Sequence, residues 1–162
     1  MSSVTISGEA QATPLQSFKA VAAARREVSA LMGSIERHAL AFGKGAPDVE
    51  LAVRRTPERC VVQVGRVGLS VSWLQPQPNT IADSALLVIE WDGIVTLHGE
   101  ATPLARRATL LRERGLHLDS AGRDWLWRSE DPPAHAFTSE ELAHSCVEMV
   151  ARRVEQTAPD AR

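Results

Sequence analysis

The sequence predicts an α+β protein, in which an antiparallel sheet of about six strands is flanked by a long N-terminal helix and a C-terminal helix. Apolar residues recur at three- and four-residue steps towards both ends of the chain, which is the period of an amphipathic helix. Between these segments, apolar and polar residues alternate as in strands, with turn residues separating the runs. Alternating strand and helix units, which a parallel sheet requires, are missing.

Length and composition are typical of one globular domain, so residues 1–162 are expected to form a single unit. Of these residues 44% are hydrophobic and 23% are charged, unlike the composition of disordered chains. The net charge of -2 gives no electrostatic support for a nucleic-acid partner. Neither a secretory signal nor a membrane-spanning run is recognisable, so we expect a cytoplasmic protein that does not contact membranes.

The first predicted element is a helix that begins at Thr13 and ends near Gly43. Thr13-Pro14-Leu15-Gln16 has the order of a helix start, and residues 1–12 are expected to be loose or to add one marginal edge strand. Gly33 lies inside the helix and suggests close packing against a neighbour. The apolar stripe comprises Phe18, Val21, Ala22, Val28, Leu31, Met32, Ile35 and Ala39.

The middle of the chain predicts the sheet. Residues 49–54 and 60–64 form one hairpin, residues 69–73 a third strand, and residues 75–80 a loop because they contain two prolines. The strongest local signal is Asp92-Gly93, which suits a two-residue turn between strands 85–91 and 94–98. Both faces of this second hairpin are largely apolar, which places it near the middle of the sheet.

The remaining elements lead to the C-terminal helix. Residues 103–114 fit either a helix or a strand, and we favour a strand; residues 116–118 and 125–127 form a further hairpin. Thr138-Ser139-Glu140-Glu141 then has the pattern of a capping box at a helix start. Cys60 and Cys146 lie on apolar faces and are expected to be reduced and buried.

Few residues suggest chemistry. The familiar catalytic strings are absent, which points away from a common enzyme class, and no metal or cofactor is expected. His98 and Glu100 share a strand face, as do His117 and Asp119, and either pair could serve acid–base chemistry, although a partly buried structural histidine is the favoured interpretation. Trp125 and Trp127 share another face and could form an exposed platform for a ligand or partner, although core filling is favoured.

The sequence thus predicts a non-catalytic protein-interaction module that forms a homo-oligomer or binds another protein. The N-terminal helix is too long for a single sheet to cover, so we expect a homodimer whose interface includes part of the stripe from Phe18 to Ile35. The alternative is a small-ligand-binding domain with a pocket between sheet and helices, lined by Trp125, Trp127 and His98. A hydrolase built on His98 and Glu100 is the third hypothesis.

Overall fold

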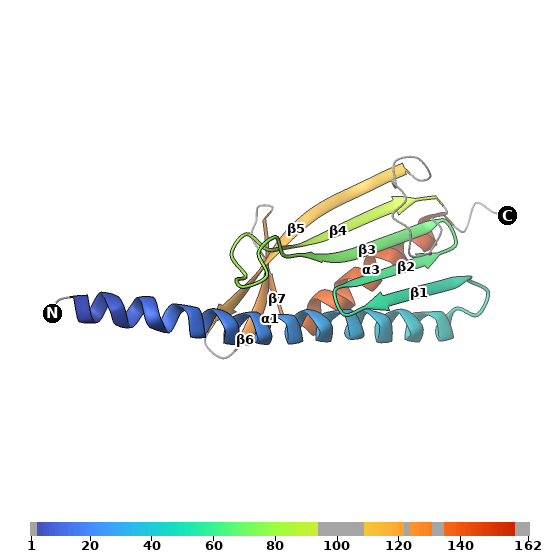
Figure 1. Cartoon of the computed structure of the whole chain (residues 1–162). Coiled ribbons are helices and arrows are strands. Elements are labelled where there is room, and N and C mark those ends of the chain that lie inside the picture. Colours follow the sequence, from blue (N-terminus) through green and yellow to red (C-terminus); the bar gives the residue numbers. More distant parts are fainter. Residues whose placement is uncertain (1–2, 94–108, 122–123, 131–134, 158–162) are drawn as a thin grey trace.

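The computed structural model of the chain describes residues 3–93, 109–121, 124–130 and 135–157, with side chains from Phe18 onward. The α+β class predicted from the sequence is confirmed (Figure 1). In chain order the elements are α1 (Ser3–Gly45), β1 (Leu51–Thr56), β2 (Arg59–Val64), β3 (Val67–Leu74), β4 (Ala85–Asp92), β5 (Thr109–Ala121), β6 (Asp124–Ser129), β7 (Ala136–Phe137) and α3 (Ser139–Thr157).

The described strands form one antiparallel sheet in which each strand pairs with the next along the chain. The hairpin of β1 and β2 is confirmed, and β3 begins earlier than expected because Val67 already pairs with Val64. The sheet has seven strands where the sequence predicted about six. The additional strand, β7, spans two residues, which is too short to produce an alternating pattern.

β4 is the fourth of the seven strands, so its central position is confirmed, but its predicted hairpin partner is wrong. β4 pairs with β3 on one side and with β5 on the other; Ile89, for example, lies between Ser70 and Glu113. Both edges of β4 are therefore occupied, and residues 94–98 lie outside the described residues. Gly93 does adopt a positive φ of 139°, but pairing of β4 along its whole length outweighs the local preference for a two-residue turn.

Residues 103–114 fitted either a helix or a strand, and the part of this segment from Thr109 onward forms a strand, β5. The same strand continues through the apolar residues at 116–118, so two predicted strands are one of 13 residues. Its second half pairs with β6, which confirms the hairpin predicted between them.

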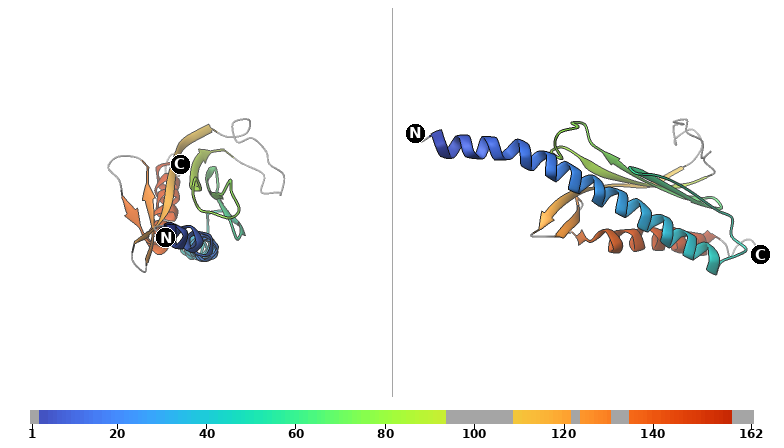
Figure 2. Two further views of the ribbon diagram at one scale, coloured as in Figure 1. Left: turned by 60° about the vertical axis from the view of Figure 1, so that its left-hand side comes forward. Right: turned by 60° about the horizontal axis from the view of Figure 1, so that its bottom comes forward.

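α1 begins at Ser3 rather than at Thr13, and its helical backbone includes residues for which the sequence predicted a loose segment. Pro14 therefore lies inside the helix, where it cannot donate the usual backbone hydrogen bond. The N-terminal part of α1 extends beyond the sheet and beyond α3 in Figure 1 and in the right-hand view of Figure 2. The residues Thr13 to Gln16 have the order of a helix start. The same order is found here within a continuous helix, so it did not identify where α1 begins.

α3 begins as the sequence predicted. The backbone N–H of Glu141 donates to Thr138 Oγ1 at 3.1 Å, and the Thr138 N–H donates to Glu141 Oε1 at 2.9 Å. These reciprocal bonds are a capping box, which satisfies two donors at the start of the helix. Neither described helix has the length and the hydrophobicity needed to cross a bilayer.

The hydrophobic core lies between the sheet and the two helices, which pack against each other on the same side of the sheet (Figure 2). Cys60 and Cys146 both belong to this core and are free thiols, as expected. Burial raises the pKa of Cys60 to about 12 and that of Cys146 to about 11. The largest fully buried side chains are Trp91, Trp127, Leu31, Met32, Ile35, Leu69, Leu86, Leu116 and Leu142.

Candidate functional site

The two tryptophans predicted as a binding platform lie in β6. Trp127 is 0% exposed, packs edge-on against Trp73 with ring centroids 5.8 Å apart, and donates from Nε1 to Ser139 Oγ at 2.9 Å. Trp125 is partly buried and packs against the same core. This placement agrees with the interpretation that the rings fill the core. His98 and Glu100 lie outside the described residues, so their role stays a prediction.

His117 and Asp119, the second histidine–carboxylate pair of the sequence, have different partners in the structure. His117 Nε2 lies 2.6 Å from Glu130 Oε2 and its Nδ1 lies 3.2 Å from the carbonyl oxygen of Ser84. Asp119 instead accepts a hydrogen bond from Arg128 Nε at 3.3 Å. Each group is thus paired with a neighbouring loop or strand, and the two do not form one acid–base unit.

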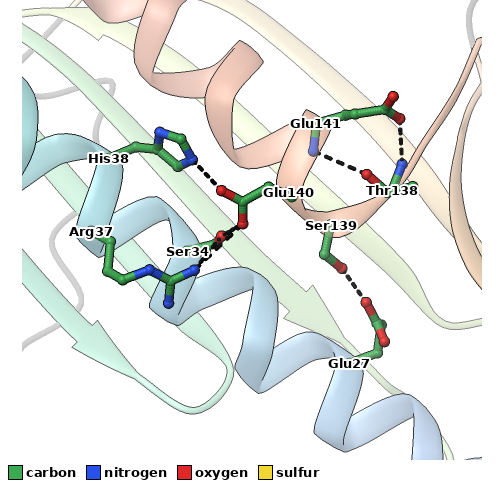
Figure 3. A network of polar contacts seen from close by, with 8 residues as sticks. All are labelled: Glu27, Ser34, Arg37, His38, Thr138, Ser139, Glu140 and Glu141. Atoms are coloured by element: carbon green, nitrogen blue, oxygen red, sulfur yellow. Dashed lines mark hydrogen bonds and ion pairs between the residues drawn. The ribbon is translucent and has the colours of Figure 1, made fainter.

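A network of polar side chains joins α1 to the first turn of α3 (Figure 3). Glu140 accepts hydrogen bonds from Ser34 Oγ and from Arg37 Nη2, the latter at 3.4 Å, and lies 2.7 Å from His38 Nε2. These three α1 residues are spaced so that they line the side of the helix that faces α3. The ring of His38 also packs edge-on against His144 of α3, with centroids 5.6 Å apart.

The same network reaches the core through Ser139. Its hydroxyl accepts the hydrogen bond from Trp127 and donates to Glu27 Oε2 of α1 at 2.5 Å (Figure 3). Ser139 thereby satisfies the only polar atom of a fully buried indole, which would otherwise cost free energy. The sequence identified Ser139 and Glu140 as helix-capping residues, but their partners on α1 could not be inferred because they are distant in sequence.

The network is suited to holding the helices together rather than to proton transfer. The hydrogen bonds from Ser34 and His38, with the positive charge of Arg37, lower the pKa of Glu140 below its ordinary value of 4.5. A carboxylate held in this way stays ionised at neutral pH and is a poor general acid. The network supplies charge-assisted hydrogen bonds between two elements.

A groove of about 630 Å³ lies beside this network, between α1 and the start of α3. Small residues dominate its α1 wall, so the groove has no deep apolar recess that would enclose a ligand. The residues that line it are Arg26, Glu27, Ser29, Ala30, Gly33, Ser34, Arg37, Thr138, Ser139 and Glu140. A second hollow of about 350 Å³ lies between the ends of β3, β4 and β5. Neither hollow is lined by Trp125 or Trp127.

The solvent-facing side of α1 carries two large apolar side chains. Phe18 is 61% exposed and Leu40 is 48% exposed. Phe18, Ser29 and Leu40 follow one another at steps of about three helical turns, so they lie on one face, which Ala22 and Gly33 share. We call these five residues the exposed stripe. The sequence analysis assigned Phe18 and Ala22 to the buried face and did not identify Leu40 as a surface residue. The regular 11-residue step from Phe18 to Ser29 to Leu40 could have indicated that these residues share a face.

One group of charges lies inside the molecule, between β4, β5 and α3. Glu90 is 4% exposed, and its Oε1 accepts a hydrogen bond from Arg153 Nε at 3.4 Å. Within the part of the chain that the structure describes, Glu90 Oε2 and Arg114 Nε have no hydrogen-bond partner, while Arg114 Nη2 lies 3.8 Å from the sulfur of Met149. Among the described residues, no group of three or more His, Cys, Asp or Glu side chains could hold a metal ion.

No protein-family model matches this chain, and no curated protein or solved structure is significantly similar to it.

Proposed function

We propose that this chain is a non-catalytic protein-interaction module that associates with a second copy of itself through α1. The observation that carries the proposal is the exposure of Phe18 and Leu40 on one face of a helix that buries another face within the chain. Large apolar side chains grouped on one surface are typical of a contact with another protein.

The length of α1 supports the same proposal. Its 43 residues span roughly 65 Å, whereas β5, the longest strand with 13 residues, spans roughly 43 Å. Among the side chains that the structure describes on α1, which begin at Phe18, Val21 is the first that is buried, and the backbone before it extends beyond the sheet (Figure 1). Most of the stability of a helix in a protein comes from packing of its apolar face, and Pro14 weakens the N-terminal segment of α1. A partner that packs along α1 would stabilise it.

The homodimer predicted from the sequence was expected to use the apolar residues from Phe18 to Ile35, and these residues differ in exposure. Leu31 and Ile35 are 0% exposed within one chain, so they are not available to a second copy, and that part of the expectation is corrected. Phe18, at the other end of the stripe, is available. The proposed contact therefore uses a different face of the same helix.

Other properties agree with a protein partner in the cytoplasm. The net charge of -2 favours a protein over a nucleic acid, and two buried free thiols suit a reducing compartment. The alternative of a ligand pocket between sheet and helices has less support, because that space is occupied by the hydrophobic core and the hollows described above lie at the surface.

Replacement of Phe18 by Glu tests the proposal. The unmodified chain is expected to be a dimer at micromolar concentration in size-exclusion chromatography with light scattering, and Phe18→Glu is expected to shift it to monomer. Leu110→Glu is the matched control, because Leu110 is 53% exposed but lies on β5 rather than on α1. An equal effect of both substitutions would show that α1 is not the binding element.

A further inference from the structure

We infer that His117 is the centre of a pH-sensitive device, which fastens the end of β6 and the turn before β4 to β5. The device holds when both ring nitrogens of His117 carry a proton, and it weakens when the ring loses one. Its partners are Glu130, which follows β6 directly, and Ser84, which precedes β4. None of these residues belongs to α1, so the inference is independent of the proposed self-association.

Both ring nitrogens of His117 face hydrogen-bond acceptors. Nδ1 lies 3.2 Å from the carbonyl oxygen of Ser84, and Nε2 lies 2.6 Å from Glu130 Oε2. A carbonyl oxygen and an ionised carboxylate can only accept hydrogen bonds, whereas a neutral imidazole carries a single N–H. Only the imidazolium form donates to both partners at once, so the two contacts together require the charged ring.

Gly115 provides the space that the carboxylate of Glu130 occupies. Gly115 and His117 are two residues apart on β5, so they lie on the same face of the strand. A Cβ placed on Gly115 would lie 2.7 Å from Glu130 Oε1 and 2.9 Å from its Cδ. The backbone N–H of Glu130 also donates to the carbonyl oxygen of Gly115 at 3.1 Å. Glu130 is therefore attached to β5 through its backbone and, separately, through its side chain.

The other partner of His117 belongs to a constrained turn. The backbone N–H of Ser84 donates to the carbonyl oxygen of Ile81 at 3.1 Å, and the Ser84 hydroxyl donates to the same oxygen. Asp83 adopts a φ of 63°, which is uncommon for a residue with a side chain and costs conformational energy. The hydrogen bond from His117 fixes the end of this turn against β5.

The remaining charges around His117 do not take the place of Glu130. Arg128 is the partner of His117 across β5 and β6, but its Nε donates to Asp119 at 3.3 Å, so these two opposite charges are paired with each other. On the other side of β5, β4 places the apolar residue Leu87 opposite Gly115. The charged residues on this face of β5, on the same face of β6 and its end, and in the turn before β4 are Glu113, Asp119, Asp124, Arg128, Glu130 and Asp83.

The direction of the pH dependence follows from the number of protons on the ring. Histidine changes its charge between about pH 5 and about pH 8, so His117 donates to both partners at the acidic end of this range and to one of them at the basic end. The fastening is therefore complete at low pH and weakens as the pH rises.

Hydrogen exchange of the backbone amide at position 130 measures the fastening, because this amide donates to Gly115. The protection factor, which corrects for the intrinsic pH dependence of exchange, is expected to fall roughly two- to fivefold from the acidic to the basic end of the range, the size of a partly exposed ion pair. His117→Gln should abolish this pH dependence. His135→Gln is the matched control, because His135 is an exposed histidine outside the device, and it should behave like the parent chain.

Two further variants separate the proton from the contact. The side-chain amide of Glu130→Gln both donates and accepts, so it can pair with the charged and the neutral ring, and protection should become independent of pH. Gly115→Ala should leave the chain folded, since the added methyl group meets only the movable end of the Glu130 side chain. It should displace the carboxylate and lower protection at every pH.

The outcomes are distinct. Loss of the pH dependence in Glu130→Gln and in His117→Gln, with retention in His135→Gln, would support the inference. A parent chain whose protection at position 130 does not change with pH, or a Glu130→Gln variant that keeps the pH dependence of the parent, would overturn it. Neither result depends on whether the chain is a monomer or a dimer.

Discussion

The indole ring of Trp91 in β4 lies directly over Gly68 of β3, its partner across the two strands. A Cβ placed on Gly68 would lie 2.1 Å from Cε2 of the ring. Trp91 Nε1 donates to Gln63 Oε1 at 3.3 Å, and Gln63 Nε2 in turn donates to the carbonyl oxygen of Gly93 at 3.0 Å. The ring is therefore fixed by its packing on Gly68 and by its hydrogen bond to Gln63, on the face of the sheet opposite the helices.

Gly68→Ala should destabilise the fold, because the added methyl group and the buried indole cannot occupy the same space. The expected loss in free energy of unfolding is about 1–3 kcal/mol, the usual cost of overpacking. Chemical denaturation followed by tryptophan fluorescence measures it. Gly33→Ala is the matched control: it should raise the free energy of unfolding by up to about 1 kcal/mol at concentrations where the chain is monomeric. A loss of stability in both variants would contradict the account of Gly68.

Glu140→Gln should change how stability depends on pH. The pKa of Glu140 is lowered in the folded chain, first by the hydrogen bond from Ser34 and then by His38, so its contribution is present above pH 4.5. This contribution is lost as the pH falls through the lowered value, because the carboxyl group becomes protonated. The difference in melting temperature between the parent and Glu140→Gln should therefore be largest near neutral pH and shrink below pH 4.5.

The control for this titration is Glu155→Gln, because Glu155 is exposed near the other end of the same helix. Its melting temperature should follow that of the parent at each pH. A difference between the parent and Glu140→Gln that stays constant down to strongly acidic pH would contradict the role of the ionised carboxylate.

Pro14→Ala should increase the helical content of the chain. Pro14 lies inside α1, and alanine would restore a backbone donor and remove the clash with the preceding turn, a gain of about 3 kcal/mol in a helix interior. The circular dichroism signal at low temperature should become more helical, and association should be retained or strengthened. An unchanged spectrum would show that Pro14 does not weaken α1.

Much of the architecture could be predicted from local patterns. Thr138 and Glu141 identify the start of α3 because both partners of a capping box lie within one helical turn. The central position of β4 followed from its two apolar faces. The partner of β4 did not follow, because the Asp92-Gly93 turn signal is local whereas the pairing with β5 depends on a strand that begins at Thr109.

The candidate site was predicted less well than the fold. Glu140 was recognised as a capping residue, but its contacts with Ser34 and His38 join segments about a hundred residues apart in sequence, which no spacing rule connects. Core filling was the favoured interpretation for Trp127, but an exposed ring was the alternative, and only the packing of α3 against β6 decides between them. Exposure of Phe18 depends on where the sheet ends, which the sequence does not specify.

Sedimentation equilibrium of the unmodified chain tests the central proposal most directly. The account predicts that the average mass rises from that of a single 17.6 kDa chain to twice that value as the concentration increases through the micromolar range, without larger species. A chain that sediments as a monomer throughout that range would contradict the proposal that the exposed stripe of α1 binds a second copy.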